Sequence, residues 1–293
     1  MQEIKYIDRK TQQIVHENPP GEGLLKFLYY SPFGQLPLHL VVKRKLLSTL
    51  YGKLMSSSRS KKNIQPFVDT YNIDMSEALL PISEFNSFNE FFYRKLKPEV
   101  RPIEEGVVSP ADGKMLVFEN ISELRSFFVK GNQFTLEKFL KDEALAAKYQ
   151  NASLILVRLA PTDYHRFHFP LDGVAYASYK ISGRYYSVSP YAITPDFARV
   201  FCENKRTYTI LSSPTRGDVL ISPVGATMVG TIINTYEPNT QVNKGDEMGY
   251  FAFGGSSLLM LIDRDQVQLD EDLLANTRQG IETSVLMGER IGV

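Results

Sequence analysis

Cysteine and long apolar runs are nearly absent from this sequence. The one cysteine, Cys202, excludes an intramolecular disulfide and is typical of a protein from a reducing compartment. No stretch approaches the roughly 20 apolar residues of a membrane-spanning helix, and the polar start, MQEIKYIDRKTQQ, lacks the apolar segment of a secretory signal. With 43% hydrophobic and 23% charged residues, the 293-residue chain is expected to form one large or two small globular domains.

Acidic side chains are missing from one segment. Between Gly23 and Val68 there is no Asp or Glu but there are eight Lys or Arg, although the whole chain has a net charge of zero. Apolar residues recur between these cations at helical spacing, which is typical of core helices with basic outer faces or of an amphipathic arm on anionic lipid. A nucleic-acid patch is the third interpretation, but the sequence has no nucleic-acid motif and its apolar content favours lipid. We therefore predict that the membrane is contacted by Lys43, Arg44, Lys45, Leu46, Leu47 and Leu50.

Helical patterns are gathered in the first third of the chain. Residues 4–16 are expected to form a polar hairpin around DRKTQ, and residues 23–96 are expected to be helical. Ser87, followed three residues later by Glu90, has the pattern of a helix start just before an apolar run.

Strand patterns follow a proline-containing linker, LKPEVRPIEEG. One helix is expected over residues 135–150, and the expected strands are SLILVRLA, GVAYASYKI, RTYTIL, DVLISPV, MVGTII and YFAF. Helices first and strands afterwards predict an α+β fold. We expect an N-terminal helical, membrane-facing region over residues 1–98. A mainly antiparallel β core, a barrel or a sandwich, should follow over residues 99–293 and carry the active site.

Histidine is scarce, which makes its placement informative. Two of the four histidines, His165 and His168, lie in the run APTDYHRFHFP, and imidazole is suited to moving protons near neutral pH. Either ring could also be a buried structural histidine. A metal site completed by Asp163 is the lesser alternative, because an extended strand points residues three apart to opposite faces. We predict proton transfer and no metal.

Glycine and serine interrupt an apolar run near the end of the chain. In GDEMGYFAFGGSSLLMLIDRD, residues 254–257 would by themselves indicate a bulge or tight turn, or else a reactive backbone at Gly255–Ser256. Asp112, in SPADG, would by itself be a turn residue. Together with the histidine pair they supply the parts of an Asp, His, Ser relay in that order. No G-x-S-x-G elbow is present, which disfavours an α/β-hydrolase.

Long motifs give the chain a resemblance to a known family. SPADG, APTDYHRFHFP, FCENKR, VGATMVGTI, KGDEMGYFAFGGSS and NTRQGIETSVLMGERIG, together with SFNEFFYRKLKP and VKGNQFTLEKFL, resemble bacterial phosphatidylserine decarboxylases, especially those of chlamydia-like bacteria. The resemblance runs from about residue 65 to the end. Many members have Leu-Gly-Ser-Thr where this chain has Gly-Gly-Ser-Ser, and both forms keep the Gly-Ser junction.

The resemblance implies that the chain makes its own cofactor, a pyruvoyl group. In that family the hydroxyl corresponding to Ser256 attacks the carbonyl of Gly255, and elimination then cuts the chain. The products here would be a β chain of residues 1–255 and an α chain of residues 256–293. The family's base corresponds to His168, oriented by Asp112.

The same resemblance implies the reaction and its setting. The amine of phosphatidylserine forms a Schiff base with the pyruvoyl ketone, CO2 is lost, and phosphatidylethanolamine is released. His165, assisted by Asp163, is the candidate proton donor or carboxylate-orienting group. The implied partners are phosphatidylserine, an anionic membrane surface and the two cleaved chains as a heterodimer, with further dimerisation left open and no nucleic acid. The implied location is peripheral, on the cytoplasmic side of the cell membrane. A pyruvoyl decarboxylase of a soluble amino acid and a non-catalytic lipid-binding protein are the alternatives.

Overall fold

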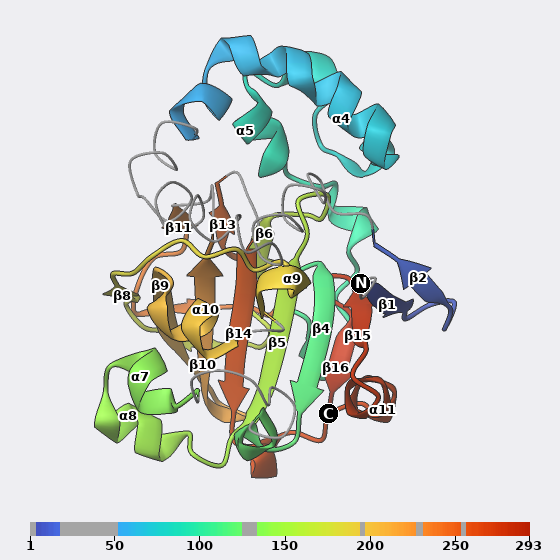
Figure 1. Cartoon of the computed structure of the whole chain (residues 1–293). Helices are drawn as coiled ribbons and strands as arrows, with labels where there is room; N and C mark the ends of the chain where they lie inside the picture. The colour runs from blue at the N-terminus through green and yellow to red at the C-terminus, as the bar shows by residue number, and fades with distance from the viewer. Residues whose placement is uncertain (1–3, 18–51, 125–133, 194–196, 227–230, 253–255) are drawn as a thin grey trace, which may run out of the picture.

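In the computed structural model, a helical region lies above the ends of the strands of a large sheet (Figure 1). The structure describes residues 4–17, 52–124, 134–193, 197–226, 231–252 and 256–293. Within these residues the largest sheet has 11 strands. In spatial order they are β12 (Thr240–Val242), β7 (Gly173–Ala175), β9 (Arg206–Ser213), β10 (Gly217–Gly225), β14 (Ser256–Ile262), β5 (Ser153–Leu159), β4 (Gly113–Phe118), β15 (Glu282–Val285), β1 (Lys5–Asp8) and β2 (Ile14–His16), with β8 (Tyr179–Ile181) paired to β9.

The large sheet is antiparallel except where β1 runs parallel to β15. Its path ends at β12 on one side and β2 on the other, so the described strands form an open sheet. The predicted α+β class is confirmed and the barrel alternative is wrong. Closure requires strand tilt and stagger to bring the two edges together, and here β2 at one edge and β12 at the other each pair on one side only.

Both faces of the central strands are covered, which explains their unbroken apolar runs. Every residue of β5 and β14 is buried. One face packs against α7 (Leu136–Leu140), α8 (Glu143–Lys148), α9 (Pro190–Ile193) and α10 (Phe197–Glu203). The other packs against a small sheet of β11 (Ile232–Asn234), β13 (Glu247–Phe251) and β6 (Arg166–His168), and against α11 (Glu271–Arg278). The small pair β3 (Val107–Val108) and β16 (Arg290–Gly292), with η6 (Ile121–Glu123) and η7 (Arg264–Gln266), completes this part.

The helix expected over residues 135–150 is broken into α7 and α8. Lys141 adopts a left-handed conformation with φ 57°, which ends α7. The Asp142 side chain then accepts the N–H of Leu145 and starts α8. A single left-handed residue therefore makes two short helices of one apolar pattern.

The helical region has a hydrophobic core of its own. Phe85, Phe88, Phe91 and Phe92 pack with Ile64 and neighbouring apolar side chains. Its elements are η2 (Ser58–Asn63), α4 (Ile64–Tyr71), η3 (Met75–Glu77), η4 (Ile82–Glu84), α5 (Phe88–Phe92) and η5 (Pro98–Val100). The helix start predicted at Ser87 is present, because its hydroxyl accepts the N–H of Glu90. The division into regions 1–98 and 99–293 stays a prediction.

The N-terminal hairpin predicted over residues 4–16 is confirmed as β1 and β2, and it forms one edge of the large sheet. Asp8 closes its turn by accepting the backbone N–H and the hydroxyl of Thr11. The predicted membrane contacts, Lys43 to Leu47 and Leu50, lie outside the described residues. Within the part of the chain that the structure describes, no helix combines the length and apolar character needed to span a bilayer.

Candidate active site

Ser256 is the first residue of the central strand β14, which begins on the side of the sheet nearest the helical region (Figure 1). It pairs with Leu159 on one side and Gly225 on the other. Its side chain is fully buried, and among the described residues its Oγ has no hydrogen-bond partner. A buried hydroxyl without a partner costs free energy of about 1–3 kcal/mol. The Ser256 hydroxyl therefore contributes no hydrogen bond to the stability of the fold among the described residues.

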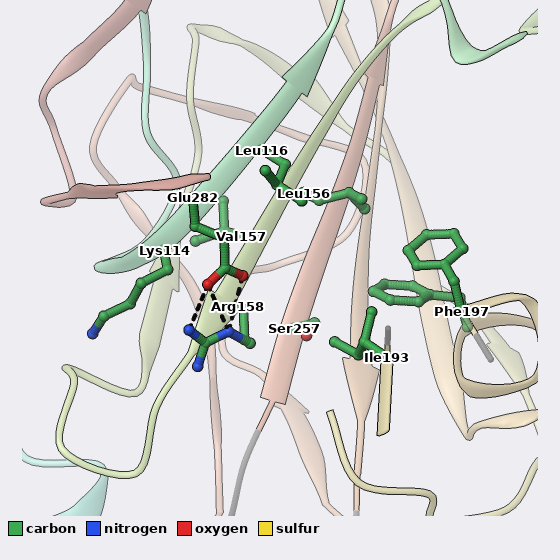
Figure 2. A pocket seen from close by; sticks show the side chains of 10 residues that line it. Lys114, Leu116, Leu156, Val157, Arg158, Ile193, Phe197, Ser257 and Glu282 are labelled. Atoms are coloured by element: carbon green, nitrogen blue, oxygen red, sulfur yellow. Dashed lines mark hydrogen bonds and ion pairs between the residues drawn. The ribbon is translucent and has the colours of Figure 1, made fainter. Parts of the chain in front are cut away.

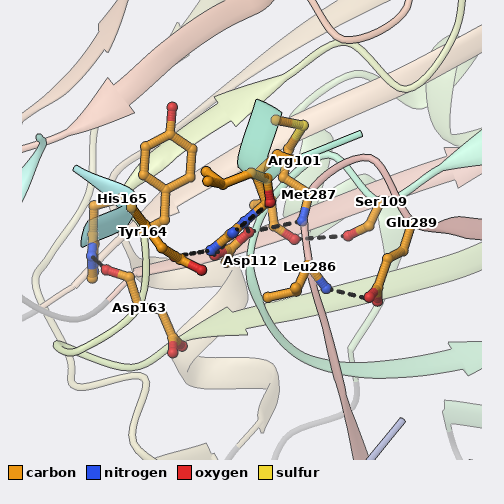
Figure 3. Close-up of polar contacts among 12 residues, drawn as sticks. Arg101, Ser109, Asp112, Asp163, Tyr164, His165, Leu286, Met287 and Glu289 are labelled. Atoms are coloured by element: carbon orange, nitrogen blue, oxygen red, sulfur yellow. Dashed lines mark hydrogen bonds and ion pairs between the residues drawn. The ribbon is translucent and has the colours of Figure 1, made fainter. Parts of the chain in front are cut away.

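Asp112 lies at the same end of the sheet as Ser256, just before the first residue of β4. Lys114 is paired with Arg158, so Gly113 lies opposite Leu159, two strands or about 10 Å from Ser256. The Asp112 carboxylate accepts three hydrogen bonds from Arg101, one from Nη2 at 2.7 Å and two from Nε at 3.0 and 3.2 Å (Figure 3).

The backbone N–H of Met287 also donates to Asp112, at 2.8 Å. Burial raises the pKa of this carboxyl group, and the Arg101 guanidinium and the Met287 N–H oppose that rise. Arg101 also pairs with Glu77, which ties the helical region to this end of the sheet.

His168 ends β6 with both ring nitrogens engaged. Nδ1 lies 2.8 Å from the carbonyl oxygen of Gly245, and Nε2 lies 3.1 Å from the hydroxyl of Tyr164. Because a carbonyl only accepts, Nδ1 carries the proton and Nε2 accepts from the phenol. Burial lowers the pKa of His168 and raises that of Tyr164, so the imidazole is neutral and the phenol protonated near pH 7.

The structure therefore does not join Asp112, His168 and Ser256 by direct hydrogen bonds. Asp112 is paired with Arg101 and His168 with Tyr164. The two are still neighbours, because the backbone N–H of His168 donates to the carbonyl of Pro110 at 2.7 Å. Sequence reasoning missed both partners. Tyr164, four residues before His168 in the same motif, was open to notice, whereas nothing in the pattern around Arg101 indicated its role.

His165 occupies a different position from His168. Residues 166–168 are an extended strand, which separates the Cα atoms of the two histidines by about 10 Å along the chain. The His165 ring packs against the ring of Phe92, with centroids 3.9 Å apart and planes tilted by 36°, and its Nδ1 donates to the carbonyl of Asp163 at 2.9 Å. Its own carbonyl accepts the N–H of Phe251, the last residue of β13. His165 thus lies beside the strand that leads to Gly255–Ser256.

The Asp163 carboxylate is already hydrogen-bonded within the protein. It accepts from Lys114 Nζ at 2.8 Å and from the N–H of Ala160 at 2.7 Å. Burial raises the pKa of Asp163, but Lys114 and the Ala160 N–H outweigh it and hold the pKa below its usual value. Among the residues described, no group of three His, Cys, Asp or Glu side chains is arranged to bind a metal ion.

A small pocket lies on the opposite face of β14 from Ser256 (Figure 2). Ser257 points into it, between the Arg158–Glu282 ion pair and Ile193, because successive strand residues face opposite sides. The other lining residues are Lys114, Leu116, Leu156, Val157, Phe197 and Phe201. The pocket encloses about 20 Å³, room for about one water molecule. In this arrangement it is too small for a phospholipid headgroup.

Comparison with known proteins identifies the family. A family model described as phosphatidylserine decarboxylase matches residues 88–293. Proteins named phosphatidylserine decarboxylase proenzyme from Fusobacterium nucleatum subsp. nucleatum, Clostridium novyi and Desulfitobacterium hafniense are 53%, 47% and 44% identical to this chain. Each alignment covers 99% of this chain and 98% or 99% of the relative, so the similarity reaches beyond residue 65 toward the N-terminus. By both the family model and these relatives, the chain belongs to the phosphatidylserine decarboxylase family.

Proposed function

We propose that this protein decarboxylates phosphatidylserine to phosphatidylethanolamine with a pyruvoyl group made from its own Ser256. The observation that carries the proposal is the buried Ser256 hydroxyl, without a partner among the described residues. It stands at a Gly-Ser junction in a chain whose relatives are named as proenzymes. A hydroxyl kept free of structural hydrogen bonds is available as a nucleophile.

Self-cleavage would begin with attack of the Ser256 oxygen on the carbonyl carbon of Gly255. The hydroxyl proton passes to a base, which returns it to the nitrogen of residue 256 as the C–N bond breaks. An ester thereby replaces the peptide bond, and the nitrogen becomes a free amine. Removal of the Cα proton then expels the carboxylate of Gly255 from Cβ, which cuts the chain. Hydrolysis of the remaining dehydroalanine releases ammonia. The products are the β chain 1–255 and the α chain 256–293.

His168 is the proposed base for this cleavage. Its neutral ring has a lone pair on Nε2, which accepts from Tyr164, so the serine must replace the phenol before the proton can move. The negative charge of Asp112 raises the proton affinity of this imidazole, while burial acts in the opposite direction. We assign to Asp112, fixed by Arg101, the stabilisation of the imidazolium that proton transfer creates.

His165 is the proposed group for turnover of the substrate. When present, a pyruvoyl group supplies a ketone that holds the substrate amine and accepts the electron pair released with CO2. The packing against Phe92 and the hydrogen bond to Asp163 fix the imidazole of His165 beside the end of β13. A group fixed in this way can orient the substrate carboxylate or deliver a proton without a large entropic cost.

Phosphatidylserine vesicles incubated with the mature protein should release CO2, whereas free serine should release little. The reason is that serine lacks both the phosphodiester and the acyl chains through which a lipid enzyme holds its substrate. CO2 trapping and lipid chromatography measure the two products. Equal rates with serine would favour the soluble amino-acid alternative. An uncleaved chain that releases CO2 from neither would favour the lipid-binding alternative.

We further propose peripheral binding to the cytoplasmic face of the membrane through Lys43, Arg44, Lys45, Leu46, Leu47 and Leu50. Each cation near an anionic surface contributes about 1 kcal/mol. Changing Lys43, Arg44 and Lys45 together to Gln should weaken binding to phosphatidylserine vesicles by about 10²-fold. Added salt should weaken wild-type binding too, because the Debye length is about 8 Å at physiological ionic strength.

Co-sedimentation with vesicles across a salt series measures this binding. Self-cleavage of the triple variant serves as the control and should remain complete, since Ser256 lies in the sheet. Equal co-sedimentation of variant and wild type at every salt concentration would show that this segment does not bind the membrane.

A further inference from the structure

Arg94 is a buried arginine that has no anionic partner among the described residues. The residue lies two positions after the end of α5 and is 7% exposed. Among the residues that the structure describes, its Nε has no hydrogen-bond partner and the guanidinium forms no ion pair. The guanidinium lies over the ring of Phe91, with 5.1 Å from its carbon atom to the ring centroid.

Other buried arginines among the described residues have hydrogen-bond partners. Arg101 is held by Asp112 and Glu77, and Arg158 by Glu17 and Glu282. Arg206 has no anionic partner within this part of the chain, but its guanidinium donates to the backbone carbonyls of Lys138, Phe139 and Asn204. An isolated charge in a protein interior is expensive unless an opposite charge and hydrogen bonds accompany it. A single contact with an aromatic ring compensates only part of that cost. Burial accordingly lowers the pKa of Arg94, although the group stays charged at neutral pH.

The unpaired guanidinium lies beside the proposed turnover site. Phe92, two residues earlier, packs against the ring of His165, and the carbonyl of Tyr93 accepts from Arg166 Nε at 2.9 Å. Asp112, Asp163 and Glu77 are near enough to attract Arg94 electrostatically. All three carboxylates are already paired, Asp112 and Glu77 with Arg101 and Asp163 with Lys114. The carboxylates that attract Arg94 are therefore those around the proposed active site, and among the described residues none of them is free to pair with it.

We infer that Arg94 binds the phosphodiester of the substrate headgroup, an inference that rests on the proposed function. Phosphatidylserine has two anionic groups, a carboxylate and a phosphodiester. The carboxylate loses its charge as CO2 departs, so an arginine bound to it would stabilise the ground state more than the transition state and slow the reaction. The phosphodiester keeps its charge in substrate, transition state and product. A fixed guanidinium can therefore bind it throughout without opposing the chemistry.

Soluble headgroup fragments test this assignment on the mature protein by NMR titration. Arg94→Gln should weaken binding of glycerophosphoserine and glycerophosphoethanolamine by about tenfold or more, and should leave serine binding unchanged. Arg94→Lys should give an intermediate loss, because it keeps the charge but not the forked geometry. In the vesicle assay KM should rise while kcat changes little. Arg264→Gln is the matched control, since Arg264 is exposed and paired with Asp265, and should behave as wild type.

Thermal unfolding of the ligand-free protein separates a binding role from a structural one. Arg94→Met should raise the melting temperature or leave it unchanged, because it removes a buried charge that lacks a partner. A clear fall in melting temperature would show that Arg94 stabilises the fold and would overturn the inference. Equal binding of glycerophosphoethanolamine by wild type and Arg94→Gln would also overturn it, as would loss of serine binding alone. Failure of the proposed function would look different, because mature protein would then release no CO2 from phosphatidylserine in any variant.

Discussion

Ser256→Ala should remain one polypeptide of 293 residues and should release no CO2 from phosphatidylserine. Wild-type protein should instead separate under denaturing conditions into chains of residues 1–255 and 256–293. The reason is that the methyl group of alanine cannot attack the Gly255 carbonyl, so neither the cut nor the cofactor can form. Intact mass measurement distinguishes the two outcomes, and the smaller wild-type chain should have an N-terminus blocked to Edman degradation.

Ser257→Ala is the matched control for this experiment. Ser257 is also a fully buried serine whose Oγ has no partner among the described residues, but its side chain points to the opposite face of β14. This variant should cleave and turn over, since the nucleophile is untouched. Two chains from Ser256→Ala, or one uncleaved chain from Ser257→Ala, would contradict the assignment of Ser256.

The second large effect separates the two histidines. His168→Ala should slow self-cleavage by about 10²–10⁴-fold, the usual contribution of a positioned base, and Asp112→Asn should slow it as well. His165→Ala should mature normally and then decarboxylate about 10²–10⁴-fold more slowly. The Cα atoms of the two histidines lie about 10 Å apart along the chain and the rings have separate hydrogen-bond partners, so each change should leave the other ring in place.

Gel analysis of newly synthesised chains measures cleavage, and CO2 release measures turnover. Full activity of His165→Ala would remove His165 from the site. If the same variant failed to mature, His165 would also be needed for self-cleavage, and the two histidines would not have separate roles.

Cleavage should also report the protonation of His168. Its pKa lies below the usual value near 6.5, chiefly because of burial. The unfolded chain therefore takes up this proton at a higher pH than the folded chain. The stability due to the neutral ring is complete above about pH 6.5 and is lost as pH falls through the folded pKa. The cleavage rate of freshly synthesised chains should be level from pH 8 to 6.5 and fall only at lower pH. A fall already above pH 7 would contradict His168 as the base.

Local patterns determined much of this protein. The run SLILVRL specified β5, because its continuous apolar core is typical of a strand buried on both faces. Ser87 and Asp8 specified a helix start and a hairpin turn, since each bonds a backbone N–H only three residues away. The ordered motifs around Asp112, His168 and Ser256 identified the family, which the comparisons confirm.

Other features depended on partners that are distant in the sequence. Asp112 accepts from the backbone of Met287, 175 positions away, and that contact exists only because β15 pairs with β4 in one register. The open sheet and the unpaired guanidinium of Arg94 depend likewise on how whole elements pack. Sequence patterns record whether a residue prefers the interior and which local conformation it favours. They do not record which side chain faces it there, because that is decided by strand register and packing across the whole fold.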